Sequence, residues 1–451
     1  MAVNLGKLEL DLAVLSKTVS SATDRLTLAK IISKIRNGSV TTVGGLDNLP
    51  NVSSVEDGSL FFVESEGTVY VAHRSLNAWK TLSSNYFGSI WAWGENVSGK
   101  LGDNSSTPRV SPVSVVGGFT DWCQVSISNA GGGGVRTNGT LWSWGSGLTG
   151  RLGDNTNVSK SSPVSVVGGF TDWCQVSVGY AHTAAVRTNG TIWAWGSNTC
   201  GMLGDNTTAG RFSPVSVVGG FTDWCQVSAG YRHSIALRTN GTIWSWGCNG
   251  NGRLGDNTIV SRSSPVSVVG GFTDWCQASA GLEHSVAVRT NGTIWAWGYN
   301  GCGRLGDNTT IDKSSPVSVV GGFTDWCQVS AGGAHTAAVR TNGTLWSWGF
   351  NGSGRLGDNS LVTKSSPVSV VGGFTDWCQV SAGGVHTAAV RTNGTIWSWG
   401  ANNIGQLGDN TIANKSSPVS VVGGFNSWSS ICASVATTSS SAVVALLRKT
   451  F

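Results

Sequence analysis

The stretch Trp326-Cys-Gln-Val-Ser-Ala-Gly-Gly-Ala-His-Thr-Ala-Ala-Val-Arg-Thr-Asn-Gly-Thr-Leu-Trp-Ser-Trp-Gly349 decides the fold, because close copies of it recur along the chain. Its Trp-x-Trp-Gly end returns at an unvarying spacing of 51 residues. The first tryptophans of these copies are Trp91, Trp142, Trp193, Trp244, Trp295, Trp346 and Trp397. A fixed period of this length indicates a propeller or a solenoid.

One repeat has the features of a small antiparallel sheet. Residues 326–331 and 345–348 alternate bulky and small or polar side chains, which favours strands. Thr341-Asn-Gly-Thr344 lies between two apolar runs and is a turn signal. Pro367 heads a last short strand and suits a sheet edge, where no backbone donor is needed. Such a sheet cannot bury both faces alone, but sheets packed radially can.

Both ends of the repeat region are incomplete. The chain enters at Gly88-Ser-Ile-Trp91 without a preceding Trp-Cys-Gln-Val strand. It leaves through Trp428-Ser-Ser-Ile-Cys432 and residues 442–447, without a following Trp-x-Trp-Gly strand. We therefore expect an all-β fold over residues 86–451, a seven-bladed β-propeller closed by N- and C-terminal strands that share one blade.

The repeat also resembles a known family. The pattern Ala331-Gly-Gly-Ala-His335, Gly343-Thr-Leu-Trp-Ser-Trp-Gly349, Leu356-Gly357 and Pro367 is similar to the regulator-of-chromosome-condensation repeat. This resemblance, which spans residues 86–451, implies a seven-bladed propeller. It does not select a function, because the same fold serves exchange factors, inhibitors, light sensors and binding modules.

The first 85 residues carry none of the repeat markers. A helical 3-4-3-4 spacing is followed by Leu5, Leu8, Leu12, Leu15 and Val19. It favours a seam for self-association, although residues 8–14 also alternate as a strand would. We expect a short α-helical oligomerisation and anchoring segment over residues 1–40 and a small β-meander adaptor over residues 41–85. The latter resembles short modules of bacteriophage tail-fibre and other virion proteins.

Composition excludes several classes of function. No run of about 18 apolar residues occurs, so no membrane insertion is expected. The first ten residues lack a basic region followed by an apolar stretch, so a signal peptide is not indicated. The net charge of only +5 and the lack of a basic arm argue against nucleic-acid binding. Without paired carboxylates, a nucleophile elbow or a phosphate loop, we expect no enzyme, no catalytic residues and no cofactor.

Two chemically reactive residue types recur but are expected to be structural. The histidines are His182, His233, His284, His335 and His386. Positions related by the repeat diverge from the axis, so we expect a hydrogen bond to a turn within each blade and no metal site. The cysteines at one repeat position are Cys123, Cys174, Cys225, Cys276, Cys327 and Cys378. We expect them to be small buried residues, too far apart for disulfides.

Candidate binding residues lie where the repeats diverge. Strand positions are almost copied, whereas the loops after Trp-x-Trp-Gly and Leu-Gly-Asp-Asn vary, as do the positions two before histidine. Varied loops on a copied frame are typical of a recognition surface, although neutral drift is the alternative. The aromatic candidates in these loops are Tyr299, Phe350, Tyr180 and Tyr231.

A second candidate set is a basic rim. One repeat position is basic in every copy, as Arg109, Lys160, Arg211, Arg262, Lys313, Lys364 and Lys415. Such a rim attracts anionic glycans or lipopolysaccharide phosphate, and the alternative is pairing with the aspartates of Leu-Gly-Asp-Asn. Another ring of arginines, from Arg136 to Arg391, is expected to tie blades together.

These features predict a phage virion appendage, a tail fibre or fibre-like protein whose propeller binds a host-surface receptor without covalent chemistry. Several heads on one homo-oligomeric stalk would add avidity, and residues 1–85 would contact other virion proteins. The expected location is the virion, after synthesis in the host cytoplasm. The alternatives are an intracellular propeller that binds a protein partner such as a small GTPase, and a purely structural virion protein.

Overall fold

The computed structural model describes residues 88–435 and 441–448 in full, and before them the backbone of four strands. Contacts divide the chain into two compact units, Met1–Tyr86 and Phe87–Phe451. The predicted helical seam at residues 5–19 lies outside the described residues and stays a prediction. Among the described residues, no helix is long and apolar enough to cross a membrane.

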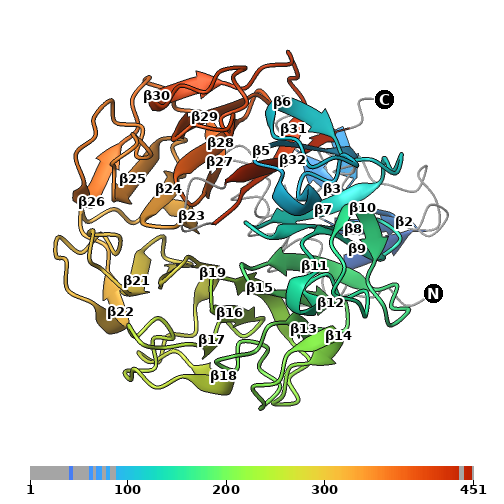
Figure 1. Cartoon of the computed structure of the whole chain (residues 1–451). Helices are drawn as coiled ribbons and strands as arrows, with labels where there is room; N and C mark the ends of the chain where they lie inside the picture. The colour runs from blue at the N-terminus through green and yellow to red at the C-terminus, as the bar shows by residue number, and fades with distance from the viewer. Residues whose placement is uncertain are drawn as a thin grey trace. The chain divides into compact units, whose positions relative to one another are not determined.

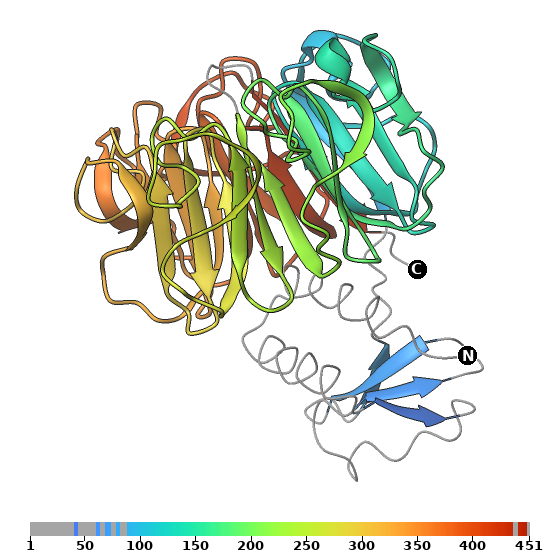
Figure 2. The ribbon, with the colours of Figure 1, turned by 90° about the horizontal axis from the view of Figure 1, so that it is seen from below.

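The first unit contains a four-stranded sheet. Its strands are β1 (Val40–Val43), β2 (Leu60–Val63), β3 (Thr68–His73) and β4 (Ala78–Thr81). This sheet is drawn in blue in Figure 2. The order is β1-β2-β3-β4, with antiparallel pairing from β2 to β4 and parallel pairing of β1 with β2. The antiparallel part is a meander, and β1 adds a parallel strand that the sequence did not indicate.

The second unit repeats one set of four strands. The complete sets are β7 (Trp122–Ile127), β8 (Gly131–Arg136), β9 (Leu141–Gly145), β10 (Lys160–Ser165); β11 (Trp173–Val178), β12 (His182–Arg187), β13 (Ile192–Gly196), β14 (Arg211–Ser216); β15 (Trp224–Ala229), β16 (His233–Arg238), β17 (Ile243–Gly247), β18 (Arg262–Ser267); β19 (Trp275–Ala280), β20 (His284–Arg289), β21 (Ile294–Gly298), β22 (Lys313–Ser318); β23 (Trp326–Ala331), β24 (His335–Arg340), β25 (Leu345–Gly349), β26 (Lys364–Ser369); and β27 (Trp377–Ala382), β28 (His386–Arg391), β29 (Ile396–Gly400), β30 (Lys415–Ser420). Each set forms an antiparallel sheet in chain order, and the sheets follow one another around a ring (Figure 1).

The two ends of the repeat region share a sheet, as predicted. It combines β31 (Trp428–Ala433) and β32 (Ala442–Arg448) with β5 (Gly88–Gly94) and β6 (Arg109–Ser114), in the order β31-β32-β5-β6. The pairing of β32 with β5 runs from Ala442↔Gly94 to Arg448↔Gly88. A single further pairing, Gly88↔Trp122, joins this sheet to β7. The last strand of the ring is therefore hydrogen-bonded to the first.

The local turn and edge predictions are confirmed. Gly343 has φ +75°, and its backbone N–H donates to the carbonyl of Arg340, which closes the Thr-Asn-Gly turn. A side chain rarely adopts that φ, which explains the glycine. Pro367 lies in β26, the outermost strand of its sheet, where the missing backbone donor costs no ladder bond.

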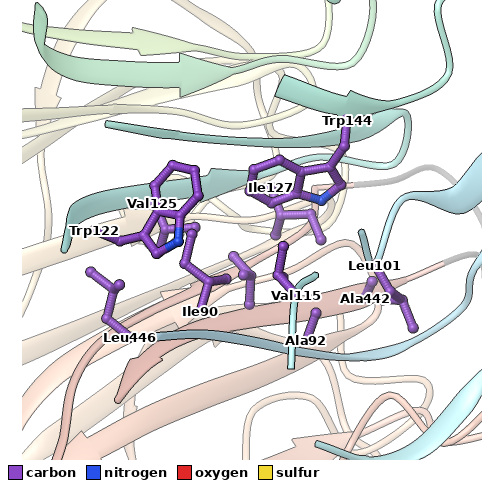
Figure 3. Packing of buried hydrophobic residues seen from close by; sticks show 11 residues of the cluster. Ile90, Ala92, Leu101, Val115, Trp122, Val125, Ile127, Trp144, Ala442 and Leu446 are labelled. Atoms are coloured by element: carbon purple, nitrogen blue, oxygen red, sulfur yellow. The ribbon is translucent and has the colours of Figure 1, made fainter. Parts of the chain in front are cut away.

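The hydrophobic core lies between successive sheets. In one such layer Ile90, Val444 and Leu446 of the shared sheet pack against Trp122 and Trp144 of the next (Figure 3). The two indole rings meet edge to face at a centroid distance of 6.2 Å. The Trp144 indole N–H also donates to the backbone carbonyl of Lys100, 2.9 Å away in the shared sheet's loop. The second tryptophan of Trp-x-Trp-Gly thus joins neighbouring sheets.

Glutamines complete the innermost strands. The first strand of each set has no partner strand on its inner edge, so its backbone groups there need other partners. Gln277 of β19 supplies them for Val329 of β23, because its amide nitrogen donates to the Val329 carbonyl (3.2 Å) and its amide oxygen accepts from the Val329 N–H (2.9 Å). Ser430 occupies this repeat position in β31.

Candidate functional site

The loops between third and fourth strands, and the turns between first and second strands, lie at one edge of the sheets because antiparallel strands alternate in direction. We call the surface they form the loop face. Its loops are residues 95–108, 146–159, 197–210, 248–261, 299–312, 350–363 and 401–414. Its turns are residues 128–130, 179–181, 230–232, 281–283, 332–334 and 383–385.

A buried asparagine bonded to an aspartate holds six of the seven long loops in shape, and Gly147 takes the asparagine's position in the other. In the loop after β17, the amide nitrogen of Asn249 donates to the Asp256 carboxylate (3.0 Å), and its oxygen accepts from the Leu254 N–H. The Thr258 N–H and hydroxyl also donate to Asp256. Burial opposes ionisation of Asp256, but hydrogen bonds from Thr258, Arg262 and Asn249 keep its pKa below the usual value. The carboxylate therefore belongs to the frame of the loop.

The predicted basic rim is partly paired with these aspartates. Ion pairs of 2.8 to 3.7 Å join Arg109 to Asp103, Arg211 to Asp205, Arg262 to Asp256 and Lys313 to Asp307. This was the alternative to ligand binding. For Lys160, Lys364 and Lys415 the described residues provide no ion pair, so these three cations leave more of their charge to solvent or to a partner.

Exposed apolar side chains are concentrated on the loop face. Twelve large hydrophobic residues are exposed in the part of the chain whose side chains the structure describes, and ten of them lie in the long loops of this face: Val97, Leu148, Val158, Ile259, Val260, Ile311, Phe350, Leu361, Val362 and Ile412. Val97 and Leu148 belong to short 3-10 turns, Val97–Gly99 and Leu148–Gly150. Most of the ten are more than half exposed, so packing within the chain does not require them.

The aromatic candidates also lie on the loop face, where each contacts a neighbouring tyrosine or arginine side chain. Tyr180 and Tyr231, from adjacent turns, have ring centroids 4.5 Å apart, and the Arg232 guanidinium lies 5.0 Å from the Tyr231 ring. The guanidiniums of Arg304 and Arg355 lie over Tyr299 and Phe350, at 4.5 and 4.8 Å.

Buried arginines join neighbouring sheets, a role that was not predicted from the sequence. The Nη1 atoms of Arg304 and Arg355 donate to the carbonyls of Gly333 and Gly384, in the turn of the next sheet, over 2.9 and 2.8 Å. Burial lowers the pKa of Arg355 to about 10. These arginines share a repeat position that is basic in five copies and is occupied by Met202 and Gln406 in the other two. A ring of surface charge would not explain the two exceptions, and they were the signal in the sequence.

The histidine prediction needs a correction. All five rings are buried, and His284 Nε2 lies 3.0 Å from the Thr336 hydroxyl of the following sheet. His182, His233 and His335 contact hydroxyls of the following sheets in the same way. The role is structural, but it joins neighbouring sheets and not a turn within one blade. Burial lowers the pKa of His182 to about 3.

The arginine ring at the opposite edge also differs from its prediction. Arg340 pairs with Asp325 at 2.8 Å, and its guanidinium lies 4.1 Å from the Phe323 ring. Arg340 ends β24, and Asp325 directly precedes β23 of the same sheet. The prediction that this ring ties blades together is therefore wrong, because each arginine closes its own sheet.

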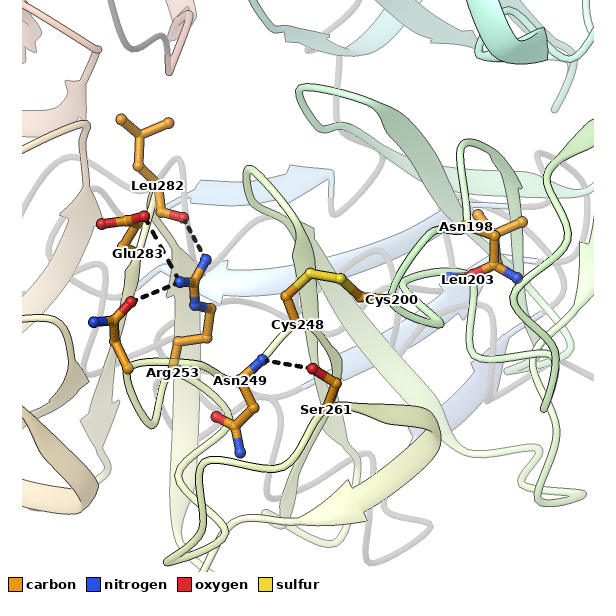
Figure 4. Close-up of a disulfide and its surroundings, with 10 residues drawn as sticks. Asn198, Cys200, Leu203, Cys248, Asn249, Arg253, Ser261, Leu282 and Glu283 are labelled. Carbon is orange, nitrogen blue, oxygen red and sulfur yellow. Dashed lines mark hydrogen bonds and ion pairs between the residues drawn. A yellow bond between two sulfur atoms is a disulfide. The ribbon is translucent and has the colours of Figure 1, made fainter.

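The cysteines divide into two groups. None of the six at the predicted repeat position forms a disulfide, and they are partly exposed, not buried. Cys200 and Cys248, which lie in the varied loops after β13 and β17, are joined by a disulfide (Figure 4). Sequence reasoning missed it because it weighed only the cysteines that recur with the period.

Comparison with known proteins identifies the repeat. The model for the regulator of chromosome condensation (RCC1) repeat matches residues 138–186, 189–237, 240–288, 291–339, 342–390 and 393–439, well over half of the chain. The chain belongs to the RCC1 repeat family. Its RCC1 repeats are 29% identical over 343 residues to the ultraviolet-B receptor UVR8 of Arabidopsis thaliana, which covers 73% of this chain and 76% of UVR8.

Two further RCC1 proteins extend this comparison. The mitochondrial RCC1 domain-containing protein RUG3 of Arabidopsis thaliana is 27% identical over 356 residues, covering 71% of this chain and 79% of RUG3. The crystal structure of Prp20p from Saccharomyces cerevisiae superposes with a TM-score of 0.71 at 18% identity, covering 81% of this chain and 93% of Prp20p. This last likeness shows the propeller fold alone.

These relatives overturn the functional prediction. They are a plant receptor, a plant mitochondrial protein and the yeast protein Prp20p, which is described as binding Gsp1p and histones. The phage tail-fibre assignment, the host glycan or lipopolysaccharide and virion partners, and the virion location are therefore wrong. The error arose because a short β-meander before a repeat domain was given the weight of a motif, although such meanders are tolerant of sequence.

Proposed function

We propose that the chain is a non-catalytic RCC1-repeat protein that binds a protein partner through its loop face. The observation that carries the proposal is the concentration of exposed large hydrophobic residues there. Nine of the ten are aliphatic side chains that are more than half exposed, so packing within the free chain covers little of them. Burying them against a partner would release apolar surface from water.

The construction of the loop face also suits binding. Aromatic residues and arginine are enriched at the centres of protein interfaces, and this face offers Tyr231, Tyr299 and Phe350 beside arginines. The asparagine–aspartate bonds and buried arginines hold the loops in place before a partner arrives, which lowers the entropic cost of association. Lys364 and Lys415 would favour acidic residues around the partner's apolar contact.

We further infer that the propeller has seven blades, from the sheet that begins with β7 to the shared sheet. The proposed domains are residues 1–40, 41–85 and 86–451, and the division of contacts between Tyr86 and Phe87 supports the last boundary. Within the loop face, we propose Tyr180, Tyr231, Tyr299 and Phe350 as contact residues.

The test compares two matched surfaces of the full-length chain. Ile259→Ser, Ile311→Ser and Leu361→Ser are combined to remove apolar area from the loop face. Val320→Ser is the control, because Val320 is an exposed hydrophobic residue in the connection after β22, at the opposite edge. The first probes are purified Gsp1p and core histones, because Prp20p is described as binding Gsp1p and histones. The second probes are proteins captured from a eukaryotic lysate.

We expect the triple variant to lose at least tenfold in affinity for a captured protein, since a loss of about 1.4 kcal/mol summed over three buried apolar side chains is tenfold. The Val320→Ser chain should bind as the parent does. A partner that binds the triple variant normally but is lost from Val320→Ser would place the site on the opposite edge and contradict the proposal.

A further inference from the structure

On the loop face, successive sheets are tied by a basic side chain at one repeat position. Arg151, Arg253, Arg304 and Arg355 each donate to a backbone carbonyl in the turn of the next sheet. Lys100 makes the corresponding link through the Asn129 side chain, 3.1 Å away. These links explain why the cations are tolerated at low exposure, because each donates to a fixed acceptor across the junction.

The junction between the β11–β14 sheet and the β15–β18 sheet lacks this cation. Met202 stands at the position, and a thioether has no proton to donate. Its backbone is placed as in the other repeats, because the Met202 carbonyl accepts from the Trp246 indole (2.9 Å) and the Ser234 hydroxyl (3.0 Å). The Arg304 carbonyl accepts from Trp348 and Thr336 in the same manner. Only the bond from a cationic side chain is missing.

The disulfide that occurs among the described residues lies at the same junction. Cys200 lies two residues before Met202, in the loop after β13, and Cys248 directly follows β17 in the next sheet. The bond therefore crosses the junction whose arginine is absent. Figure 4 shows it beside Arg253, which makes the ordinary tie at the following junction through the Leu282 carbonyl.

We infer that the Cys200–Cys248 disulfide is a redox-dependent tie that takes the place of the missing arginine. A dithiol reductant would break the sulfur–sulfur bond, deliver two electrons and two protons to form two thiols, and leave as its own disulfide. The sheets would then meet at this junction without a covalent bond or a cationic tie, and would keep there the Trp246 and Ser234 bonds to the Met202 carbonyl and the Tyr180–Tyr231 ring contact. Five other junctions keep their arginine or lysine bonds in either redox state, and Gln406 occupies the position at the remaining one.

A second pair of positions, Cys302 and Phe350, supports the idea that a disulfide and an arginine bond are alternatives at a junction. Cys302 lies two repeats after Cys200, and Phe350 lies two repeats after Cys248. The cysteine is thus present again, but its counterpart is phenylalanine. At that junction Arg304 supplies the tie to Gly333.

The first test measures thermal unfolding of the full-length chain with and without dithiothreitol. Reductant should lower the midpoint of the parent by about 5 °C, from the usual value of a disulfide in a protein of this size. Cys248→Ser should have the lower midpoint in both conditions. Met202→Arg added to Cys248→Ser should restore the midpoint and leave it insensitive to reductant, because the new guanidinium can donate to the Tyr231 carbonyl.

Hydrogen exchange at residues 197–203 and 230–232 supplies a local measurement, since a repeat protein can loosen at one junction before it unfolds. Faster exchange after reduction is expected there and not at residues 299–305. An unchanged midpoint together with unchanged exchange would overturn the inference, as would a Met202→Arg double variant that exchanges as fast as Cys248→Ser alone.

The second test transfers the tie. Phe350→Cys should cross-link to Cys302 on air oxidation, which peptide mapping and a thiol count would show. Ala401→Cys is the matched control, because its counterpart is Ser353 and no cross-link can form there. A Phe350→Cys chain whose thiols both remain free would show that the two positions do not face each other across a junction, and would remove the basis for the exchange.

Discussion

At the scale of single residues, the ring depends on side chains that satisfy the backbone of a neighbouring sheet. The Gln277 amide serves both backbone groups of Val329. An asparagine or glutamine in a strand is usually unremarkable in sequence, yet here the amide substitutes for a missing partner strand. The inner wall of the ring is therefore built from side chains as well as from strands.

Gln277→Ala should destabilise the chain by about 1–3 kcal/mol, because it leaves a buried N–H and a buried carbonyl without their partner. Chemical denaturation followed by tryptophan fluorescence would measure the change. Thr310→Ala, at an exposed loop position, is the control and should have little effect. A Gln277→Ala chain as stable as this control would show that water replaces the amide at no cost.

The buried histidines predict a dependence of stability on pH. Burial lowers the pKa of His182 and His386 to about 3, whereas in the unfolded chain the value is about 6.5. The unfolded state therefore takes up protons first, and the free energy of unfolding should fall as pH decreases from about 6.5 toward 3.

Urea midpoints between pH 7.5 and 5 would show this loss, in a range above the ordinary titration of carboxylates. Each histidine contributes up to about 1.4 kcal/mol per pH unit once the pH is well below 6.5. His284→Gln should make the decline less steep. A midpoint that rises on acidification would contradict the assignment of neutral buried rings.

At the scale of the element, the long loops are ordered by their own polar side chains and not by strand pairing. The Asn249–Asp256 bond, with Thr258 and Arg262 on the same carboxylate, closes the loop after β17. The Thr258 N–H donates to Asp256 two residues earlier, which is the local turn chemistry of an aspartate in a loop. The link back to Asn249, seven residues earlier, became visible only in the folded loop.

Asp256→Ala should loosen residues 248–261 while the ring stays folded, because four donor groups, from Asn249, Thr258 and Arg262, lose their acceptor. Hydrogen exchange and limited proteolysis would detect the change as a local opening, with a cost of about 1–3 kcal/mol for that loop. Asp256→Asn retains an acceptor oxygen and should have a smaller effect. Exchange that accelerates equally in β15 to β18 would point instead to unfolding of the whole sheet.

At the scale of the whole molecule, ring closure is the decisive contact. The shared sheet joins strands from the two ends of the repeat region through the full length of β32 and β5. In β31 of the shared sheet, beside β7, Ser430 occupies the position that is glutamine at other junctions. This junction is held instead by the core around Trp122 and by the bonds that Trp144 and Asn129 make with Lys100.

Truncation after residue 435 would remove β32 and leave β5 and β31 without their common partner. We expect loss of the cooperative thermal transition or a fall in its midpoint of more than 10 °C, since both an edge and a core layer open. Removing only residues 449–451 keeps β32 and is the control. A truncated chain with an unchanged midpoint would show that the remaining sheets are stable without closure.

The sequence alone determined the period, the strands, the Thr-Asn-Gly turn, the edge position of Pro367 and the sharing of one sheet. These follow from side-chain alternation and turn chemistry within a few residues, repeated until the pattern was unmistakable. It also marked the varied loops as candidate contacts, and these form the loop face.

Only the tertiary structure decided which side chains meet across the junctions between sheets. The arginine ties, the histidine–hydroxyl contacts and the Cys200–Cys248 disulfide each join residues from different repeats. The sequence period indicates that these positions are equivalent, but it does not predict how far each sheet is rotated relative to the next. That rotation is set by how the tryptophans and small residues pack between sheets, and it brings Cys200 to Cys248 while it leaves Cys302 opposite a phenylalanine position.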